Sequence, residues 1–260
     1  MDELNSLVVN DSQLVEIIEF IDENISNISK ENASIMISKL EEVQKQNLAK
    51  LDEKFYSSET IQKEMNEIYD NEFDINEIDN VEDEDLKDLL IETRDSGYKV
   101  ETAEGMYFPI INYEFYEKYS SYVTMDIKEY INIMAFESNE VPAMDAALVI
   151  GWDEVLERAL KQEDFISQYS DSIKINDIKE MYKKYVTFTL LGLNNTPLFN
   201  YDSKVMVDDA RNVYMNAIEG DGESKLLETL SDFLEVLKED NYKLTDESDQ
   251  FRHDALENIV

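Results

Sequence analysis

Glycine and proline are scarce in this chain, with six glycines and three prolines among 260 residues. These two residues supply most tight turns and most interruptions of helices, so the chain has few places at which a sheet of many short strands could turn. The apolar residues recur mostly at intervals of three and four, which is the spacing of one helix face. We therefore predict a mainly α, multi-helix bundle-like fold.

An N-terminal helical hairpin is the first element of this prediction. Its first stripe consists of Leu14, Ile18, Ile21, Ile25 and Ile28. Asp11 or Ser12 can cap this helix, and a second apolar stripe follows over residues 31–56. Two helices on a common core and a dimerising coiled coil both produce such stripes. We favour the first, because the stripe is short.

A domain boundary is expected between Asp70 and Asn80, because Asp and Asn side chains form hydrogen bonds with the backbone that favour non-helical conformations. A helix starting at Ser58 should end there, and a new one should begin after Asn80, with acidic residues at its positive N-terminal end. This predicts two domains: a helical hairpin or stalk over residues 1–80 and a helical domain over residues 81–260.

The segment 59–92 is strongly acidic, with 14 acidic side chains and two lysines. An EF-hand calcium loop starting at Asp70 would need a glycine where Ile75 stands and an acid where Val81 stands. The segment is therefore expected to be a solvated helix face, with weak binding of divalent cations as the alternative.

Residues 98–111 contain the one good strand signal. Two β-prone runs flank Ala103, Glu104 and Gly105, and Pro109 suits an edge strand. We predict one short β-hairpin here. Helical spacing returns over 113–122, 125–138, 143–167, 177–191, 204–218, 223–239 and 247–258. Pro142 is suited to the start of the third of these helices.

Charge excludes several classes of partner. With 60 acidic and 23 basic side chains the net charge is −37, which opposes binding to nucleic acid and to anionic membrane surfaces. The longest nearly uncharged apolar stretch, residues 186–199, is too short to span a bilayer. The N-terminal residues lack the pattern of a signal peptide. We expect no transmembrane segment and no nucleic-acid partner.

The residue inventory also excludes common chemistries. The chain has no cysteine, and His253 is its single histidine. Thiolate catalysis and the usual zinc sites are therefore absent, as are the glycine-rich phosphate-binding and nucleophile-elbow motifs. We expect no cofactor and no metal centre, and we assign no catalytic residue. A hydrolase that needs two carboxylates stays open, because acidic residues abound.

Aromatic residues concentrate in residues 98–130, which hold nine of the 26 Phe and Tyr. Tyrosine combines an apolar ring with a polar tip and suits a half-exposed binding surface. The candidate ligand-binding residues are Tyr98, Glu101, Glu104, Tyr107, Asn112, Tyr113 and Tyr116. The alternative is a structural role for the rings in the core and rim around the hairpin.

Two phrases carry a resemblance to a known group of proteins. The sequences GYKVETAEGMYFPIINY (97–113) and GLNNTPLF (192–199) resemble uncharacterised exported, lipoprotein-type helical proteins of Gram-positive spore-forming bacteria. The resemblance covers about residues 85–245 and implies an extracytoplasmic domain, tethered to the membrane or in the cell envelope, of unknown activity. It supplies no catalytic residues. The chain departs from the pattern in lacking a signal and a lipobox cysteine, and a cytoplasmic location is the alternative.

Taken together, these observations favour a non-enzymatic, extracytoplasmic-type helical binding or interaction module. Its partner is expected to be an envelope protein, a peptide or a glycan. The alternative is a carboxylate-dependent hydrolase acting on a cell-envelope polymer, with its cleft beside the hairpin. A convergent pair of carboxylates in a deep pocket would distinguish the enzyme from the binding module.

Overall fold

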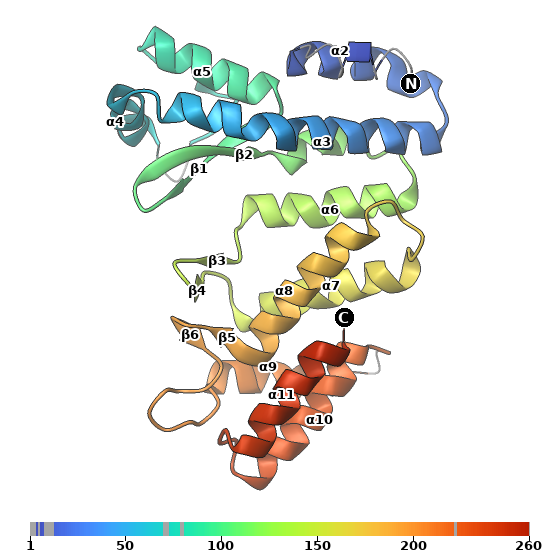
Figure 1. Ribbon diagram of the computed structural model, residues 1–260, viewed down its shortest axis with the longest axis vertical. Helices are drawn as coiled ribbons and strands as arrows, with labels where there is room; N and C mark the ends of the chain where they lie inside the picture. Colours follow the sequence, from blue (N-terminus) through green and yellow to red (C-terminus); the bar gives the residue numbers. More distant parts are fainter. Residues whose placement is uncertain are drawn as a thin grey trace. The chain divides into compact units, whose positions relative to one another are not determined.

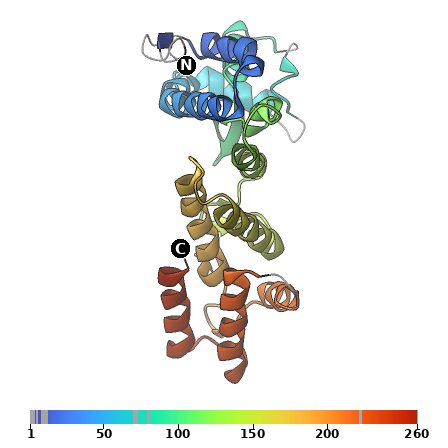
Figure 2. The same cartoon turned by 90° about the vertical axis from the view of Figure 1, so that its right-hand side faces the viewer.

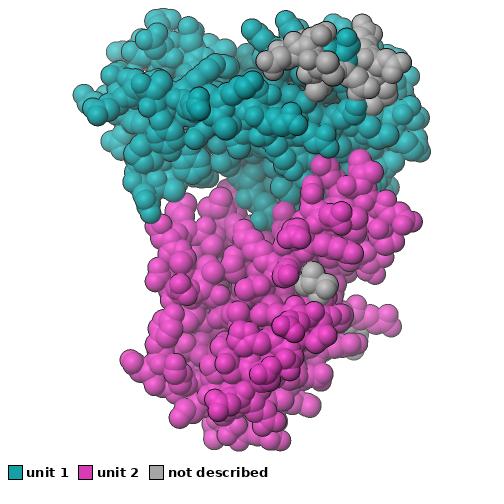
Figure 3. All heavy atoms as spheres, viewed as in Figure 1, with its two compact units in different colours: residues 1–138 teal, residues 139–260 magenta. Residues whose placement is uncertain are grey.

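The chain divides into two units, Met1–Ser138 and Asn139–Val260 (Figure 3). Each unit is mainly helical. The computed structural model describes residues 4, 6–7, 13–69, 73–78, 81–220 and 223–259. Of the boundary segment predicted between Asp70 and Asn80, residues 70–72 and 79–80 lie outside this described part. Segments on both sides of it belong to the first unit, and the separability of residues 1–80 stays a prediction.

Unit 1 contains the helical hairpin and the β-hairpin (Figure 1). Its elements are α2 (Leu14–Asn24), η1 (Ile25–Asn27), α3 (Lys30–Phe55), α4 (Glu59–Ile68), α5 (Glu84–Asp95), β1 (Tyr98–Ala103), β2 (Met106–Ile111), η3 (Tyr113–Tyr119) and α6 (Met125–Asn139). Helices α2 and α3 run side by side in opposite directions, which confirms the predicted helical hairpin (Figures 1 and 2).

Polar caps fix where the helices of unit 1 begin. The side chains of Ser29, Ser58 and Asp83 accept backbone hydrogen bonds at the N-termini of α3, α4 and α5. Gly97 follows α5 with φ +75°, a conformation that favours glycine and ends the helix. The starts of α4 after Ser58 and of α5 after Asn80 agree with those expected from the sequence. Helix α2 starts after Gln13, which makes no side-chain cap, and the expected caps Asp11 and Ser12 lie outside the described residues.

The predicted β-hairpin is confirmed at residues 98–111. Strands β1 and β2 are antiparallel, with Val100 opposite Pro109 and Ala103 opposite Met106. Glu104 (φ 52°) and Gly105 (φ 76°) form the turn. Two consecutive residues with positive φ are typical of the tight hairpin turn that matches strand twist. Helix α3 packs beside β2, so the hairpin belongs to the core of unit 1.

Unit 2 adds helices and two very short hairpins. Its elements are β3 (Ala143–Met144), β4 (Ala147–Leu148), α7 (Trp152–Gln168), α8 (Ile175–Leu191), β5 (Gly192–Leu193), β6 (Thr196–Pro197), α9 (Asp208–Ala217), α10 (Lys225–Glu239) and α11 (Asp246–Asn258). Helices α10 and α11 lie side by side in both views (Figures 1 and 2). The prediction of one hairpin is therefore incomplete.

The helix predicted over residues 143–167 is wrong in its first nine residues. Asp145 and Ala146 have φ of 47° and 57° and form the turn between β3 and β4. The second short hairpin holds this turn in place, because Asn195 N donates to Ala146 O at 2.8 Å. Pro142 therefore precedes a strand, and the helix starts after Gly151.

A buried arginine ties helices of unit 2 together. Arg158 is 5% exposed, donates to the Glu154 carboxylate and to the Glu140 main-chain oxygen, and lies 3.2 Å from the Tyr185 hydroxyl. Its charge is thereby paired in the core, which burial requires. Among the described helices of both units, none combines the length and the apolar character needed to cross a bilayer.

Candidate functional site

A buried carboxylate organises the predicted tyrosine region. Glu41 on α3 is 2% exposed and accepts hydrogen bonds from the hydroxyls of Tyr113 and Tyr130, each at 2.6 Å. Lys45, one turn further along α3, pairs with the same carboxylate at 2.7 Å. A buried charge is stable only when it is paired and hydrogen-bonded in this way. Tyr113 therefore has a structural role.

Gln44 on the next turn of α3 holds two more of the predicted tyrosines. Tyr98 donates its hydroxyl to the main-chain oxygen of Gln44 at 2.7 Å, and Tyr116 donates to the Gln44 side-chain oxygen. The Gln44 amide nitrogen donates to Ser96 O at 2.7 Å. Burial raises the pKa of Tyr98 and of Tyr116 above that of an exposed tyrosine, so both stay neutral hydrogen-bond donors.

The remaining predicted residues lie along the hairpin and do not converge. Tyr107 is buried with its ring centroid 5.1 Å from that of Tyr69. Glu101 accepts from the backbone nitrogen of Thr102. Glu104 occupies the turn, and Asn112 caps η3 by accepting from Glu114 N. The rings of all four predicted tyrosines, Tyr98, Tyr107, Tyr113 and Tyr116, pack in the core, as in the structural alternative that the sequence left open.

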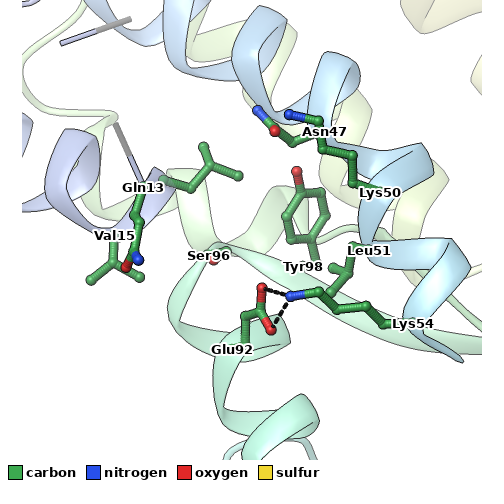
Figure 4. A pocket seen from close by; sticks show the side chains of 10 residues that line it. Gln13, Val15, Asn47, Lys50, Leu51, Lys54, Glu92, Ser96 and Tyr98 are labelled. Atoms are coloured by element: carbon green, nitrogen blue, oxygen red, sulfur yellow. Dashed lines mark hydrogen bonds and ion pairs between the residues drawn. The ribbon is translucent and has the colours of Figure 1, made fainter. Parts of the chain in front are cut away.

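A groove of about 550 Å³, called here the α3 groove, lies between α2, α3 and α5 (Figure 4). Its lining residues are Gln13, Leu14, Val15, Asn47, Lys50, Leu51, Lys54, Glu92, Ser96 and Tyr98. The four residues from α3 recur at intervals of three and four and so share one helix face. Its walls combine apolar side chains with amide, hydroxyl and charged groups.

A second groove of about 570 Å³, called here the η3 groove, shares two lining residues with the first. It is lined by Val15, Ile18, Glu19, Asn76, Arg94, Asp95, Tyr98, Asn112, Glu114, Phe115 and Lys118. Val15 and Tyr98 line both grooves. Of the predicted site residues, Asn112 and the buried Tyr98 are therefore the two that belong to the lining of this groove.

The charged groups in the two grooves are mostly paired. Lys54 contacts both carboxylate oxygens of Glu92, at 2.5 and 2.7 Å (Figure 4). Arg94 pairs with Asp95 at 2.8 Å, and Lys118 pairs with Asp22 at 2.9 Å. Glu92 is the one carboxylate that lines the α3 groove, and Lys54 neutralises it. A pair of facing carboxylates, which the hydrolase alternative needs, is not formed by the residues lining this groove.

The arrangement of the acidic side chains bears on metal binding. Within the described ranges no three His, Asp or Glu side chains are grouped so that they could hold a metal ion. In the acidic segment, Asp74 Oδ1 accepts from both nitrogens of Asn76, each at 2.8 Å. Asp70 lies outside the described residues. Weak binding of divalent cations by residues 59–92 stays a prediction.

Sequence reasoning missed most of the residues that line the α3 groove. Their common feature is position: residues 47, 50, 51 and 54 place an amide, two lysines and a leucine on one face of α3. That mixed face was the available signal, because a helix face buried in a core is apolar throughout. Comparisons with models of protein families, with curated proteins and with solved structures gave no match to this chain.

Proposed function

We propose that this protein is a non-enzymatic binding module that holds an extended peptide segment of a basic partner protein in the α3 and η3 grooves. The observation that carries the proposal is the pair of grooves that share Val15 and Tyr98. Their walls mix apolar side chains with amide and hydroxyl groups, as peptide-binding surfaces do.

Charge supports a basic partner. The sequence of unit 1 holds 34 of the 60 acidic side chains but 11 of the 23 basic ones. A field of one sign accelerates the encounter with a partner of the opposite sign and discourages anionic competitors. A basic protein is therefore steered towards unit 1, and the segment seated in the grooves fixes its position.

The burial of the predicted tyrosines favours a peptide over a glycan. All four of them, Tyr98, Tyr107, Tyr113 and Tyr116, have their rings in the core and offer no open face on which a sugar ring could stack. A peptide needs instead the hydrogen-bonding groups that line the grooves, such as those of Asn47, Ser96 and Gln13. The resemblance to exported proteins supports placing this activity outside the cytoplasm, which is part of the proposal.

The proposal is tested by filling the site. Val15 is partly exposed and lines both grooves, so Val15→Trp should obstruct them without disturbing the core. Dye-labelled soluble peptide pools of about eight residues, with basic and with acidic composition, are titrated and followed by fluorescence anisotropy. Basic pools should bind the parent, binding should weaken as salt rises, and Val15→Trp should reduce affinity at least about tenfold.

Val149→Trp is the matched control, because Val149 is half exposed and lies in unit 2, outside both grooves. This variant should bind the basic pools as the parent does. Unchanged binding by Val15→Trp, or stronger binding of acidic than of basic pools, would contradict the proposal.

A further inference from the structure

An ion pair with two-point geometry lies in the lining of the α3 groove (Figure 4). The ammonium group of Lys54 on α3 contacts both carboxylate oxygens of Glu92 on α5, at 2.5 and 2.7 Å. Both oxygens of Glu92 therefore face the same side and accept from one nitrogen. Glu92 is the one carboxylate among the ten described residues that line this groove, so a basic ligand side chain that enters it meets its opposite charge here.

The cation of this ion pair is exchangeable. The side chain of Lys54 is 51% exposed and that of Glu92 is 46% exposed. Exposed ion pairs contribute little to stability, because water solvates the separated charges well. The ammonium group of lysine is strongly hydrated and has a flexible four-carbon stem, so a displaced Lys54 can turn into solvent. A ligand cation can thus take the place of Lys54 on Glu92 without disturbing the core of unit 1.

Arginine and lysine differ in what they gain from this exchange. A ligand lysine brings one ammonium group, so it only replaces the contact that Lys54 already makes. A ligand arginine brings a planar guanidinium whose two parallel N–H groups match the two oxygens of a carboxylate, which gives a stronger and more directional pair. Its apolar stem can pack against Leu14 and Val15, which are partly exposed in the same groove.

We infer that Glu92 is the residue that selects arginine over lysine in the bound peptide, and that Lys54 makes this selection sharp by occupying Glu92 in the free protein. The inference rests on the proposed function and adds to it the identity of one basic residue of the ligand. The basic partner presents an arginine in the segment that enters the α3 groove. Lysine-rich segments are attracted by the same overall charge but gain nothing at Glu92.

The selection is tested with two dye-labelled peptide pools of about eight residues that have the same length, the same net charge and blocked termini. The basic residues are all arginine in one pool and all lysine in the other. Anisotropy titrations should show the arginine pool binding the parent at least about fivefold more tightly. Arginine also forms stronger contacts than lysine on other surfaces, so variants of the protein must trace the preference to Glu92.

Two conservative substitutions provide this second measurement. Glu92→Gln removes the carboxylate, and Lys54→Arg occupies it with a guanidinium that a ligand arginine can only replace like for like. Both should reduce the arginine preference to less than about twofold. Asp88→Asn and Lys63→Arg are the matched controls, because they make the same kinds of change at positions outside both grooves, and they should keep the parent's preference. Circular dichroism melting confirms that all four variants are folded.

The outcomes separate the two proposals. Equal affinity of the parent for the two pools overturns the selection of arginine and leaves the peptide-binding function standing. An arginine preference that survives in Glu92→Gln or in Lys54→Arg also overturns the selection by Glu92, because the preference then arises elsewhere, and so does its loss in Asp88→Asn. Failure of both pools to bind the parent overturns the peptide-binding function as well.

Discussion

The side-chain amide of Gln62 pairs with both main-chain groups of Tyr107. Its nitrogen donates to Tyr107 O at 2.8 Å, and its oxygen accepts from Tyr107 N at 2.9 Å. Tyr107 lies opposite Thr102, next to the pair that closes the hairpin turn, so its main-chain groups point away from β1. A side chain of α4 therefore takes the place of a neighbouring strand at this edge of the hairpin.

Replacing Gln62 with leucine should destabilise unit 1. Both main-chain groups of Tyr107 lose their partner, and each half-buried unsatisfied group costs about 1 kcal/mol or more. We expect the free energy of unfolding to fall by about 2 kcal/mol in urea titrations followed by circular dichroism. Gln46→Leu, an exposed position on α3, should change it by less than about 0.5 kcal/mol. Equal effects of the two substitutions would contradict this role of Gln62.

Alanine substitutions at Glu41 and at its neighbour Glu42 give a second test with a matched control. Glu41→Ala removes the carboxylate that accepts hydrogen bonds from the buried hydroxyls of Tyr113 and Tyr130. We expect a loss of about 3 kcal/mol in stability, because breaking a buried charged network is costly. Glu42 is exposed, and Glu42→Ala should stay within about 0.5 kcal/mol of the parent. Chemical unfolding at neutral pH measures both, and a tolerated Glu41→Ala would refute the structural role.

The carboxyl group of Glu64 should make the stability of the fold depend on pH. One of its carboxylate oxygens is buried without a hydrogen-bond partner, and loss of hydration together with the neighbouring Asp83 raises its pKa above the ordinary 4.5. A raised pKa means that the folded chain binds this proton more tightly than the unfolded chain. The resulting stabilisation is complete when the pH lies below the pKa that Glu64 has in the unfolded chain. It is lost as the pH rises through the pKa that Glu64 has in the folded chain.

Glu64→Gln should therefore stabilise the protein at neutral pH, and the gain should disappear below a pH of about 4. Urea unfolding across this pH range provides the measurement. Glu53→Gln on α3 is the control, since Glu53 is exposed and is not among the groups that raise the pKa of Glu64. A stabilisation that persists unchanged into acid would mean that another property of the substitution, rather than the carboxyl proton, is responsible.

Alanine substitutions at Gly97 and Gly105 distinguish the stability cost of backbone strain from that of a steric clash. Both have a positive φ, at 75° and 76°, so alanine is strained at either position. A Cβ on Gly105 would meet no atom within 4 Å, whereas one on Gly97 would lie 2.5 Å from the Gln44 amide nitrogen. Gly105→Ala should cost about 1 kcal/mol and Gly97→Ala clearly more, as measured by thermal and urea unfolding. Equal losses of stability in the two variants would contradict the close approach between residue 97 and the Gln44 side chain.

The net charge of −37 predicts a salt effect on stability. Repulsion among exposed carboxylates opposes folding at low ionic strength, and added salt screens it. The melting temperature should rise by about 2–4 °C, equivalent to about 1 kcal/mol, between about 10 and about 300 mM NaCl. A flat or falling melting temperature over this range would show that repulsion is already compensated in the folded protein.

The sequence predicted the long helices because local signals and packing agree there. Helix α3 has an apolar stripe, and Ser29 at its start caps it. At residues 143–148 the two disagree: alanine, methionine and leucine favour a helix, but the hydrogen bond from Asn195 to Ala146 O holds a hairpin. The partner is about 50 residues away in sequence, so no local window contains the information that decides this structure.

The site was predicted less well for a related reason. Tyrosine serves equally as a core residue with a satisfied hydroxyl and as a half-exposed binding residue, and its sequence position does not distinguish the two. Tyr113 is in the core because Glu41, 72 residues earlier, accepts its hydroxyl. The α3 groove depends on the spacing between α2 and α5, which is a property of the folded unit and has no counterpart in a sequence pattern.

The contact between Glu41 and Tyr130 has a consequence for synthesis on the ribosome. The two residues are 89 positions apart, and chains grow by about 5–20 residues per second, so Glu41 leaves the ribosome about 4–18 s before this partner exists. Helix α3 can form early, but its carboxylate must remain hydrated until the later segments arrive. Unit 1 therefore completes its core only near the end of its own translation, and a nascent chain stalled before Tyr130 presents the apolar face of α3 to chaperones.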